Sequence, residues 1–213
     1  MSSTRRLPVY LLIDTSGSMK GEPIESVNTG LESMLTFLRQ DPFALESVYL
    51  SIITFDNEVK QVLPLTELEA VRLPKIDNPK GGTNLGEALE LLCKTVDHEV
   101  IRNASDQKGD WMPLLFIMTD GSPSDLQKFK EQVPEVKKRN FGNIIACAAG
   151  PKAKDSFLLE ITPDVVHLDT TDSATFQQFF KWVSSTVSVG NRSMGTSSEP
   201  ILPPPPPEVQ IVH

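Results

Sequence analysis

The chain alternates between short continuous runs of apolar residues and longer segments in which apolar residues recur at every third or fourth position. Continuous apolar runs predict strands that are covered on both faces, whereas the three-and-four spacing predicts amphipathic helices. The runs that predict strands are residues 9–13, 48–55, 114–118, 143–149 and 165–168, and residues 58–63 can return as a further strand after a turn. The segments that predict helices are residues 23–38, 84–96, 124–138, 155–161 and 175–187.

Strands that alternate with helices predict βαβ units, in which the crossover helices cover both faces of a parallel sheet. The turn signal Asp56-Asn57 separates two of the predicted strands and indicates a hairpin, so one edge strand should be antiparallel. We therefore expect an α/β fold with a doubly wound, mostly parallel, six-stranded sheet, helices on both faces and one antiparallel edge strand. Asp41-Pro42 should end the first helix, and Pro134 should bend or interrupt the helix over residues 124–138.

The composition changes after Gly190. Residues 191–213 hold a Ser/Thr/Gly-rich stretch and five consecutive prolines, Pro203 to Pro207. Such a composition is typical of a mobile tail with a stiff polyproline segment. The sequence therefore predicts one domain over residues 1–190 and a flexible tail over 191–213, which is either a plain spacer or a docking peptide for a proline-reading groove.

Charge and cysteine content exclude several classes of function. The 20 Lys and Arg residues against 28 Asp and Glu give a net charge of −8 without a basic block, which argues against binding to nucleic acid or to an anionic membrane. Cys93 and Cys147 lie among apolar neighbours and are expected to be free, buried thiols, as in a reducing compartment. No apolar run approaches the ~20 residues needed to span a bilayer, and no signal-peptide pattern is present, so we expect a cytoplasmic location.

Three polar segments occur where a doubly wound sheet binds ligands, at the carboxyl ends of its strands. Residues 14–18 and 119–121 directly follow predicted strands, and residues 81–84 open a predicted helix. Their candidate donors are all hard oxygens, which suit a magnesium-like cation, although Asp14 or Asp120 alone could simply cap a helix. The five candidate ligands are Asp14, Ser16, Ser18, Thr83 and Asp120.

The same segments match a known set of motifs: DTSGSM over residues 14–19, GGT over residues 81–83 and MTDG over residues 118–121. Together they resemble the metal-ion-dependent adhesion site of the von Willebrand factor A (VWA) family, with its D-x-S-x-S motif. The resemblance spans residues 7–188 and retains all five ligand positions. Longer runs, among them DTSGSMKGEPIESVNTGL and LLFIMTDGSPSD, are similar to the TerY-like branch of small bacterial cytoplasmic VWA proteins, which is associated with tellurium-resistance and chemical-stress systems.

The resemblance implies a role for each candidate ligand. Ser16 and Ser18 would bind the metal through their hydroxyls, Thr83 would join them when the site is engaged, and Asp14 and Asp120 would act mostly through bound waters. The cation would be Mg²⁺, with Mn²⁺ or Ca²⁺ as alternatives, and its open position would take a Glu or Asp from a protein partner. Neutral inner ligands leave the cation most of its charge, so an incoming carboxylate is strongly attracted.

The TerY-like branch also implies a Ser/Thr protein kinase and a PP2C-like phosphatase as partners, with this chain as an adaptor or a phosphoacceptor. The candidate phosphoacceptors are the tail residues Ser193, Thr196, Ser197 and Ser198. The alternative reading is that these residues only keep the tail solvated.

The main alternative function is a metal-dependent phosphatase or hydrolase of the haloacid-dehalogenase type. Those enzymes use an Asp-x-Asp pair after the first strand, but Ser16 stands at the second position here. We also expect no lysine at a phosphate-clamping position and no histidine base near the site, so the sequence favours a binding module over an enzyme. An inert scaffold that does not use metal is a third reading. Trp111 is expected to be a partial core anchor, or else part of a partner footprint at the rim of the metal site.

Overall fold

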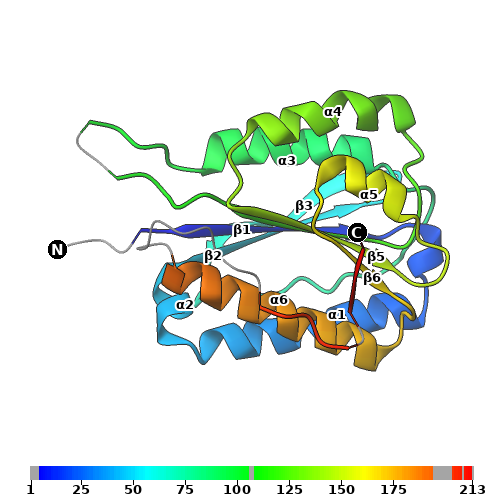
Figure 1. Cartoon of the computed structure of the whole chain (residues 1–213), viewed down its shortest axis with the longest axis horizontal. Helices are drawn as coiled ribbons and strands as arrows, with labels where there is room; N and C mark the ends of the chain where they lie inside the picture. Colours follow the sequence, from blue (N-terminus) through cyan, green and yellow to red (C-terminus); the bar gives the residue numbers. More distant parts are fainter. Residues whose placement is uncertain (1–4, 106–107, 194–202, 208, 213) are drawn as a thin grey trace.

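A seven-stranded sheet lies between two layers of helices in the computed structural model, which describes residues 5–105, 108–193, 203–207 and 209–212 (Figure 1). The strand order is β3-β2-β1-β4-β5-β6-β7. The strands are β1 (Leu7–Asp14), β2 (Val48–Phe55), β3 (Val59–Glu67), β4 (Leu114–Thr119), β5 (Asn143–Ala149), β6 (Val165–Leu168) and β7 (Gln210–Val212). The helices are the short 3-10 turn η1 (Gly17–Met19), α1 (Glu22–Arg39), α2 (Pro42–Ser47), α3 (Leu85–Glu99), α4 (Leu126–Lys138), α5 (Asp155–Ile161) and α6 (Ser173–Ser193).

Each face of the sheet packs on its own hydrophobic core. Helices α1, α2 and α6 cover one face, and α3, α4 and α5 cover the other (Figure 1). All eight residues of β1 are buried, and they alternate between the two cores: Leu11 and Ile13 face α1 and α6, whereas Tyr10 and Leu12 face α3 and α4. Burial on both faces explains why the strand is a continuous apolar run.

The parallel register aligns the strand ends that carry the candidate ligands. β1 pairs in parallel with β2 and with β4, so Asp14 lies beside Phe55 and Ile13 lies beside Met118. The residues that follow these three strands therefore meet at one edge of the sheet. This alignment confirms the α/β fold class with its mostly parallel sheet, and β2 and β3 form the expected antiparallel hairpin.

The strand count differs from the expected six, because the C-terminal segment adds a second antiparallel edge strand. β7 pairs with β6, and Val209 just before it is buried at 3% exposure in the core beneath α6. The indole Nε1 of Trp182 also donates a 2.9 Å hydrogen bond to the carbonyl of Pro203. The described tail residues thus contact the domain at these points, and the flexibility predicted for residues 191–213 stays a prediction. The arrangement is stabilised because β7 pairs with the otherwise open edge of β6 and because the Val209 side chain is buried.

An additional short helix follows α1, and α4 is not interrupted at its proline. Asp41-Pro42 ends α1 as predicted, but the same pair starts α2, because the Asp41 carboxylate accepts a hydrogen bond from Phe43 N and proline suits a first helical turn. Pro134 lies inside α4, which continues past it to Lys138 without interruption. Among the described residues no helix has the length and apolar character that crossing a membrane requires. Cys93 and Cys147 are free and buried, as predicted.

Candidate metal site at the carboxyl edge of the sheet

Asp14 ties the carboxyl ends of β1 and β4 together. Its side chain is fully buried, and its Oδ1 accepts a 2.7 Å hydrogen bond from the backbone N–H of Ser16. Its Oδ2 accepts a hydrogen bond from the hydroxyl of Thr119, the last residue of β4. Both oxygens of the carboxylate are therefore already engaged in positioning the loop that follows β1. This geometry suits an acidic group that acts on a cation from behind the direct ligands.

The next three candidate ligands are joined by hydrogen bonds. The hydroxyls of Ser16 and Ser18 are 3.1 Å apart, and the Ser18 hydroxyl donates to Asp120 Oδ1 at 2.8 Å. Ser16 is buried, whereas Ser18 is exposed and Asp120 is partly exposed. The cluster is therefore closed on the side of the sheet and open on the side of the solvent.

Thr83 is held beside this cluster by backbone contacts. Gly17 N donates to Gly81 O at 3.1 Å, and Thr83 N donates to the Ser124 hydroxyl at 2.8 Å. The Thr83 hydroxyl lies 3.2 Å from the position that a Cβ at residue 121 would occupy, so Gly121 leaves room for it next to Asp120. The structure thus brings together all five residues that the sequence singles out, and metal binding by them stays a prediction.

Asp125 fixes the start of α3, which follows the Thr83 loop. Its carboxylate accepts hydrogen bonds from Gly86 N at 3.0 Å and from Glu87 N at 2.8 Å. A carboxylate at a helix N-terminus satisfies free backbone N–H groups and complements the helix dipole. Because Asp125 stands just before α4, this contact couples the loop of Thr83 to the loop of Asp120.

The two carboxylates of the cluster are electrostatically unfavourable without a cation. Burial raises the pKa of Asp14 to about 6, and the charge of Asp120 raises it further. The hydrogen bonds from Ser16 and Thr119 lower this pKa, but they do not offset the effect of burial. Burial also raises the pKa of Asp120, while the Ser18 hydroxyl and the charge of Lys152 lower it. A bound cation would relieve both penalties.

The donor chemistry fits a hard cation. Every candidate donor is a hydroxyl or carboxylate oxygen, as Mg²⁺, Mn²⁺ and Ca²⁺ prefer. Within the described ranges, no group of three or more His, Cys, Asp or Glu side chains could hold a metal. A metal here would therefore depend on the serine and threonine hydroxyls as much as on the two acids.

Sequence reasoning missed the side chains that support the ligands. Thr119, Ser124 and Asp125 all hold a candidate ligand or its loop. The charge of Lys152 lowers the pKa of Asp120, and the expectation that no lysine stands at a phosphate-clamping position stays a prediction. The only clue to these supporting residues in the sequence is their position, because each ends a strand or follows one at the same edge of the sheet.

Trp111 does not lie at the rim of this site. It precedes β4, whereas Asp120 follows β4, so the two residues are at opposite ends of the strand. The guanidinium of Arg5 stacks on the indole ring at 3.7 Å from its centroid. The structure therefore favours the core-anchor interpretation of Trp111, which packs against the core beneath α6.

Comparison with curated proteins finds partial relatives. The chain is 32% identical over 123 residues to an uncharacterized protein of Synechocystis sp., covering 55% of this chain and 26% of that protein. It is 24% identical over 163 residues to Sporozoite surface protein 2 of Plasmodium yoelii yoelii, covering 69% of this chain and 18% of that protein. The chain thus spans about a quarter or less of the length of these relatives.

Solved structures and a family model share this fold. The pilus adhesin SpaC from Lactobacillus rhamnosus GG superposes with a TM-score of 0.67 at 14% identity, over 89% of this chain and 31% of that chain. The ArnB paralog VWA2 from Sulfolobus acidocaldarius superposes with a TM-score of 0.58 at 17% identity, over 87% of this chain and 46% of that chain. The model of the von Willebrand factor type A domain matches residues 9–182. The chain therefore belongs to the von Willebrand factor type A domain family.

Proposed function

We propose that this protein is a Mg²⁺-dependent protein-binding module that holds a partner through a carboxylate of that partner. The observation that carries the proposal is the hydrogen-bonded set of Asp14, Ser16, Ser18 and Asp120, with Thr83 beside it, at the open edge of the sheet. Domains of this family are in general interaction modules without enzymatic activity. The metal would supply a positive charge that attracts an acidic side chain to a chain of net charge −8.

The arrangement of donors explains why the cation would stay attractive to a partner. Asp14 already accepts two hydrogen bonds, and the Asp120 carboxylate accepts one from Ser18. Both acids are therefore positioned to act on the cation indirectly, through the groups that donate hydrogen bonds to them. Neutral hydroxyls in direct contact leave most of the positive charge available to an incoming carboxylate. Ser18 lies on the exposed side of the cluster, where a partner would approach.

The finer role that we propose is an adaptor or phosphoacceptor in a cytoplasmic tellurite-resistance and chemical-stress signalling complex, with a Ser/Thr kinase and a PP2C-like phosphatase. The resemblance of the motifs over residues 14–31 and 114–125 to the TerY-like branch supports it. Of the candidate phosphoacceptors, Ser193 is the last residue of α6. Thr196, Ser197 and Ser198 lie outside the described residues.

A haloacid-dehalogenase-type phosphatase has less support from the site. Lys152 near Asp120 would suit a phosphate group, but Ser16 occupies the position where that chemistry needs a second carboxylate. Asp14 is also fully buried, with both oxygens hydrogen-bonded, which is unsuitable for a nucleophile that must reach a substrate.

Capture of partners with and without the cation tests the proposed function. The full chain, immobilised and exposed to lysate of its native host, should retain a kinase and a phosphatase in millimolar Mg²⁺ and lose them in EDTA. Re-addition of Mg²⁺ should restore capture, because the cation bridges the two proteins. Equal capture in Mg²⁺ and EDTA would contradict a metal-bridged contact.

The raised pKa of Asp14 makes both stability and metal binding depend on pH. Without metal, the folded protein holds this proton up to about pH 6, whereas an unfolded Asp releases it near 3.8. The contribution to stability is therefore fully present below the unfolded pKa and is lost as the pH rises to the folded pKa. It amounts to roughly 3 kcal/mol, at about 1.4 kcal/mol for each unit of pKa shift.

Urea unfolding in EDTA between pH 4 and pH 7.5 would measure this dependence. The free energy of unfolding of the wild type should fall with pH relative to an Asp14→Asn variant, which cannot ionise at this position. Mg²⁺ affinity should change in the opposite direction and rise up to about pH 6, because the cation competes with the proton. Parallel unfolding curves for the two proteins would refute the assignment of this titration to Asp14.

A further inference from the structure

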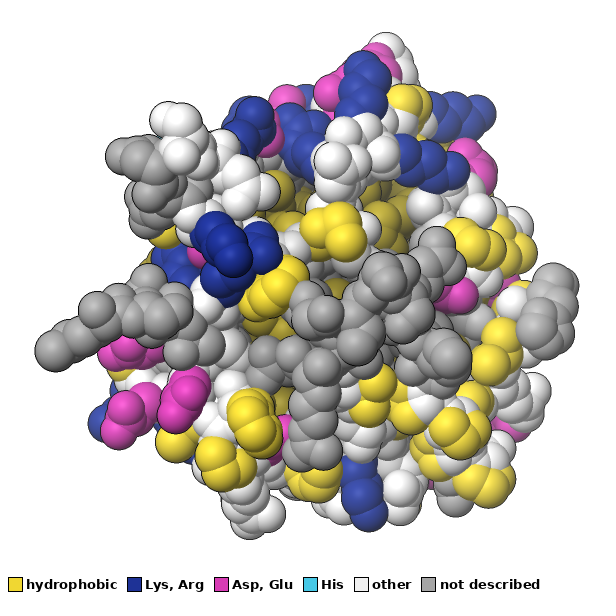
Figure 2. All heavy atoms as spheres, turned by 60° about the vertical axis from the view of Figure 1, so that its left-hand side comes forward, with side chains coloured by type: hydrophobic (Ala, Val, Ile, Leu, Met, Phe, Trp, Pro, Cys, Tyr) yellow, Lys and Arg dark blue, Asp and Glu magenta, His cyan; other side chains and the backbone are white. Residues whose placement is uncertain are grey.

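A hollow of about 360 Å³ lies at the end of the sheet opposite the candidate metal site. It is bounded by the C-terminal ends of α3 and α4 and by residues 100–103 and 110–113, which precede β4. Figure 2 shows this end of the molecule, with apolar side chains at the floor of a hollow and Lys and Arg side chains along its margins. The hollow is separate from the residues described so far, with the exception of Trp111 in its wall.

Apolar side chains that water reaches line this hollow. Ile101 is 41% exposed and Met112 is 53% exposed, and both line it together with Val96, Val100 and Phe141. Exposed apolar groups that gather in one concave place, rather than being scattered singly, are typical of a binding site. The floor is therefore suited to an apolar side chain of a ligand.

The walls of the hollow are held in place by hydrogen bonds. The Asp110 carboxylate accepts two hydrogen bonds from the Arg6 guanidinium, at 2.8 and 2.6 Å, and one from Ile101 N at 2.8 Å. Gly142 N donates to Pro113 O at 2.8 Å and so ties the segment after α4 to the start of β4. A site formed in advance loses little conformational entropy when a ligand binds.

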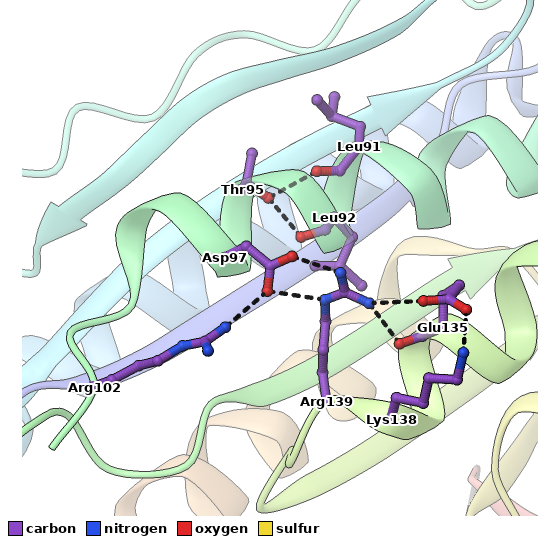
Figure 3. Close-up of polar contacts among 8 residues, drawn as sticks. All are labelled: Leu91, Leu92, Thr95, Asp97, Arg102, Glu135, Lys138 and Arg139. Carbon is purple, nitrogen blue, oxygen red and sulfur yellow. Dashed lines mark hydrogen bonds and ion pairs between the residues drawn. The ribbon is translucent and has the colours of Figure 1, made fainter.

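Cations on the rim are held by two acids. Figure 3 shows the Arg139 guanidinium on the Asp97 carboxylate, with Nη2 at 2.5 Å from Oδ2 and Nε at 3.1 Å from Oδ1. Arg139 holds the pKa of Asp97 below its usual value. Arg102 reaches the same carboxylate at 3.3 Å, and Lys138 contacts Glu135 at 2.5 Å. Arg139 therefore joins α3 to α4, which is a structural role.

Arg102 and Lys138 differ from Arg139 in their exposure. Their side chains are 79% and 69% exposed, against 22% for Arg139. Exposed ion pairs contribute little to stability, about 0–1 kcal/mol, so these two cations can exchange a protein carboxylate for one on a ligand. The lining residues carry three cations and two acids, and these pair with Arg6 and Glu135 from outside the lining. The group therefore has four cations against three acids, an excess of one positive charge. The rim is thus locally positive on a protein of net charge −8.

We propose that this hollow binds a short acidic segment of a partner protein that carries one apolar side chain. The apolar side chain would contact Ile101 and Met112, and carboxylates on either side of it would contact Arg102 and Lys138. Both features are on one face, and neither requires the metal. The protein would then have two docking sites at opposite ends of its sheet. One would bind an acidic partner through a cation, and the other would bind it through basic side chains.

Amide chemical shifts of the full chain in EDTA would test this site. The probe is a synthetic twelve-residue peptide of Asp and Glu residues around a single Phe residue. It should shift the backbone amide signals of residues 96–103, 110–112 and 138–142 in a saturable way. A control peptide with Lys at every acidic position should leave them unchanged. The use of EDTA separates this result from the proposed metal-dependent function, whose failure would not affect it.

Charge reversal at the rim gives the sharper comparison. Arg102→Glu with Lys138→Glu should weaken peptide binding at least tenfold, and Met112→Ser should weaken it severalfold. The matched control is Lys60→Glu with Lys75→Glu, which changes the net charge equally at exposed positions elsewhere and should leave the affinity within twofold.

Three results would overturn the proposal. The first is the lack of any saturable shift at millimolar peptide. The second is an unchanged affinity after charge reversal at Arg102 and Lys138. The third is an equal affinity for a single-stranded oligonucleotide of the same charge, which would indicate a general anion surface rather than a site for an acidic peptide.

Discussion

An Asp14→Asn variant should keep its fold but lose about a hundredfold in Mg²⁺ affinity, and with it the Mg²⁺-dependent capture of partners. Asparagine retains the oxygen that accepts from Ser16 N, and its amide can face the Thr119 hydroxyl, so the loop after β1 can stay in place. Only the negative charge behind the cation is removed. Because Asp14 is fully buried, loss of this charge should not destabilise the metal-free protein at pH 7.

Isothermal calorimetry with Mg²⁺ and thermal unfolding with and without Mg²⁺ would measure this effect. The wild type should gain thermal stability on addition of Mg²⁺, and the variant should need about a hundredfold more Mg²⁺ for the same gain. Thr83 offers a matched pair of controls, because Thr83→Ser keeps the hydroxyl and Thr83→Val removes it at nearly constant volume. If the Asp14→Asn variant binds Mg²⁺ with the wild-type affinity, Asp14 does not contribute to metal binding.

A Gly86→Ala variant should be destabilised by about 2 kcal/mol, although alanine is the better helix former. A Cβ at residue 86 would lie 2.3 Å from Phe129 N and 2.7 Å from the carbonyl carbon of Lys128, so α3 and α4 could not keep their close approach. Alanine gains roughly 1 kcal/mol in helix propensity, whereas overpacking costs roughly 3 kcal/mol where backbone must move. The same Cβ would lie 2.8 Å from Asp125 Oδ2, so the cap of α3 and the Thr83 loop should also shift.

Urea unfolding would give the change in free energy, and a Mg²⁺ titration would give the accompanying loss of affinity. At this chain length, a change of about 2 kcal/mol corresponds to a fall in Tm of roughly 4–8 °C. Lys94→Ala, at an exposed position of the same helix, is the control and should be nearly neutral. A Gly86→Ala protein as stable as the wild type would show that α3 and α4 can separate without cost.

The sequence predicted the order and type of the elements well wherever local pattern and tertiary environment agree. Continuous apolar runs became parallel strands because both faces of the sheet are covered. The differences arose where a local signal has two readings. Asp41-Pro42 both ends one helix and starts another, and the polar composition of the tail conceals Val209, whose burial depends on a surface formed by distant residues.

The candidate site shows the same division. Its five ligands could be named because their motifs follow strands whose carboxyl ends meet at one edge. Their supports could not be named, because a hydrogen bond between Thr119 and Asp14 joins residues 105 positions apart. The hollow at the opposite end depends equally on long-range contacts, since Arg139 meets Asp97 from another helix.

The sequence by itself determined the α/β architecture, the family motifs and the oxygen-only chemistry of the candidate site, because these depend on residue type and on short, regular spacings. Only the tertiary structure decided the place of the tail, the raised pKa of Asp14 and the basic apolar hollow. Each of these results from burial or proximity among residues far apart in the chain, and spacing along the sequence carries no record of such contacts.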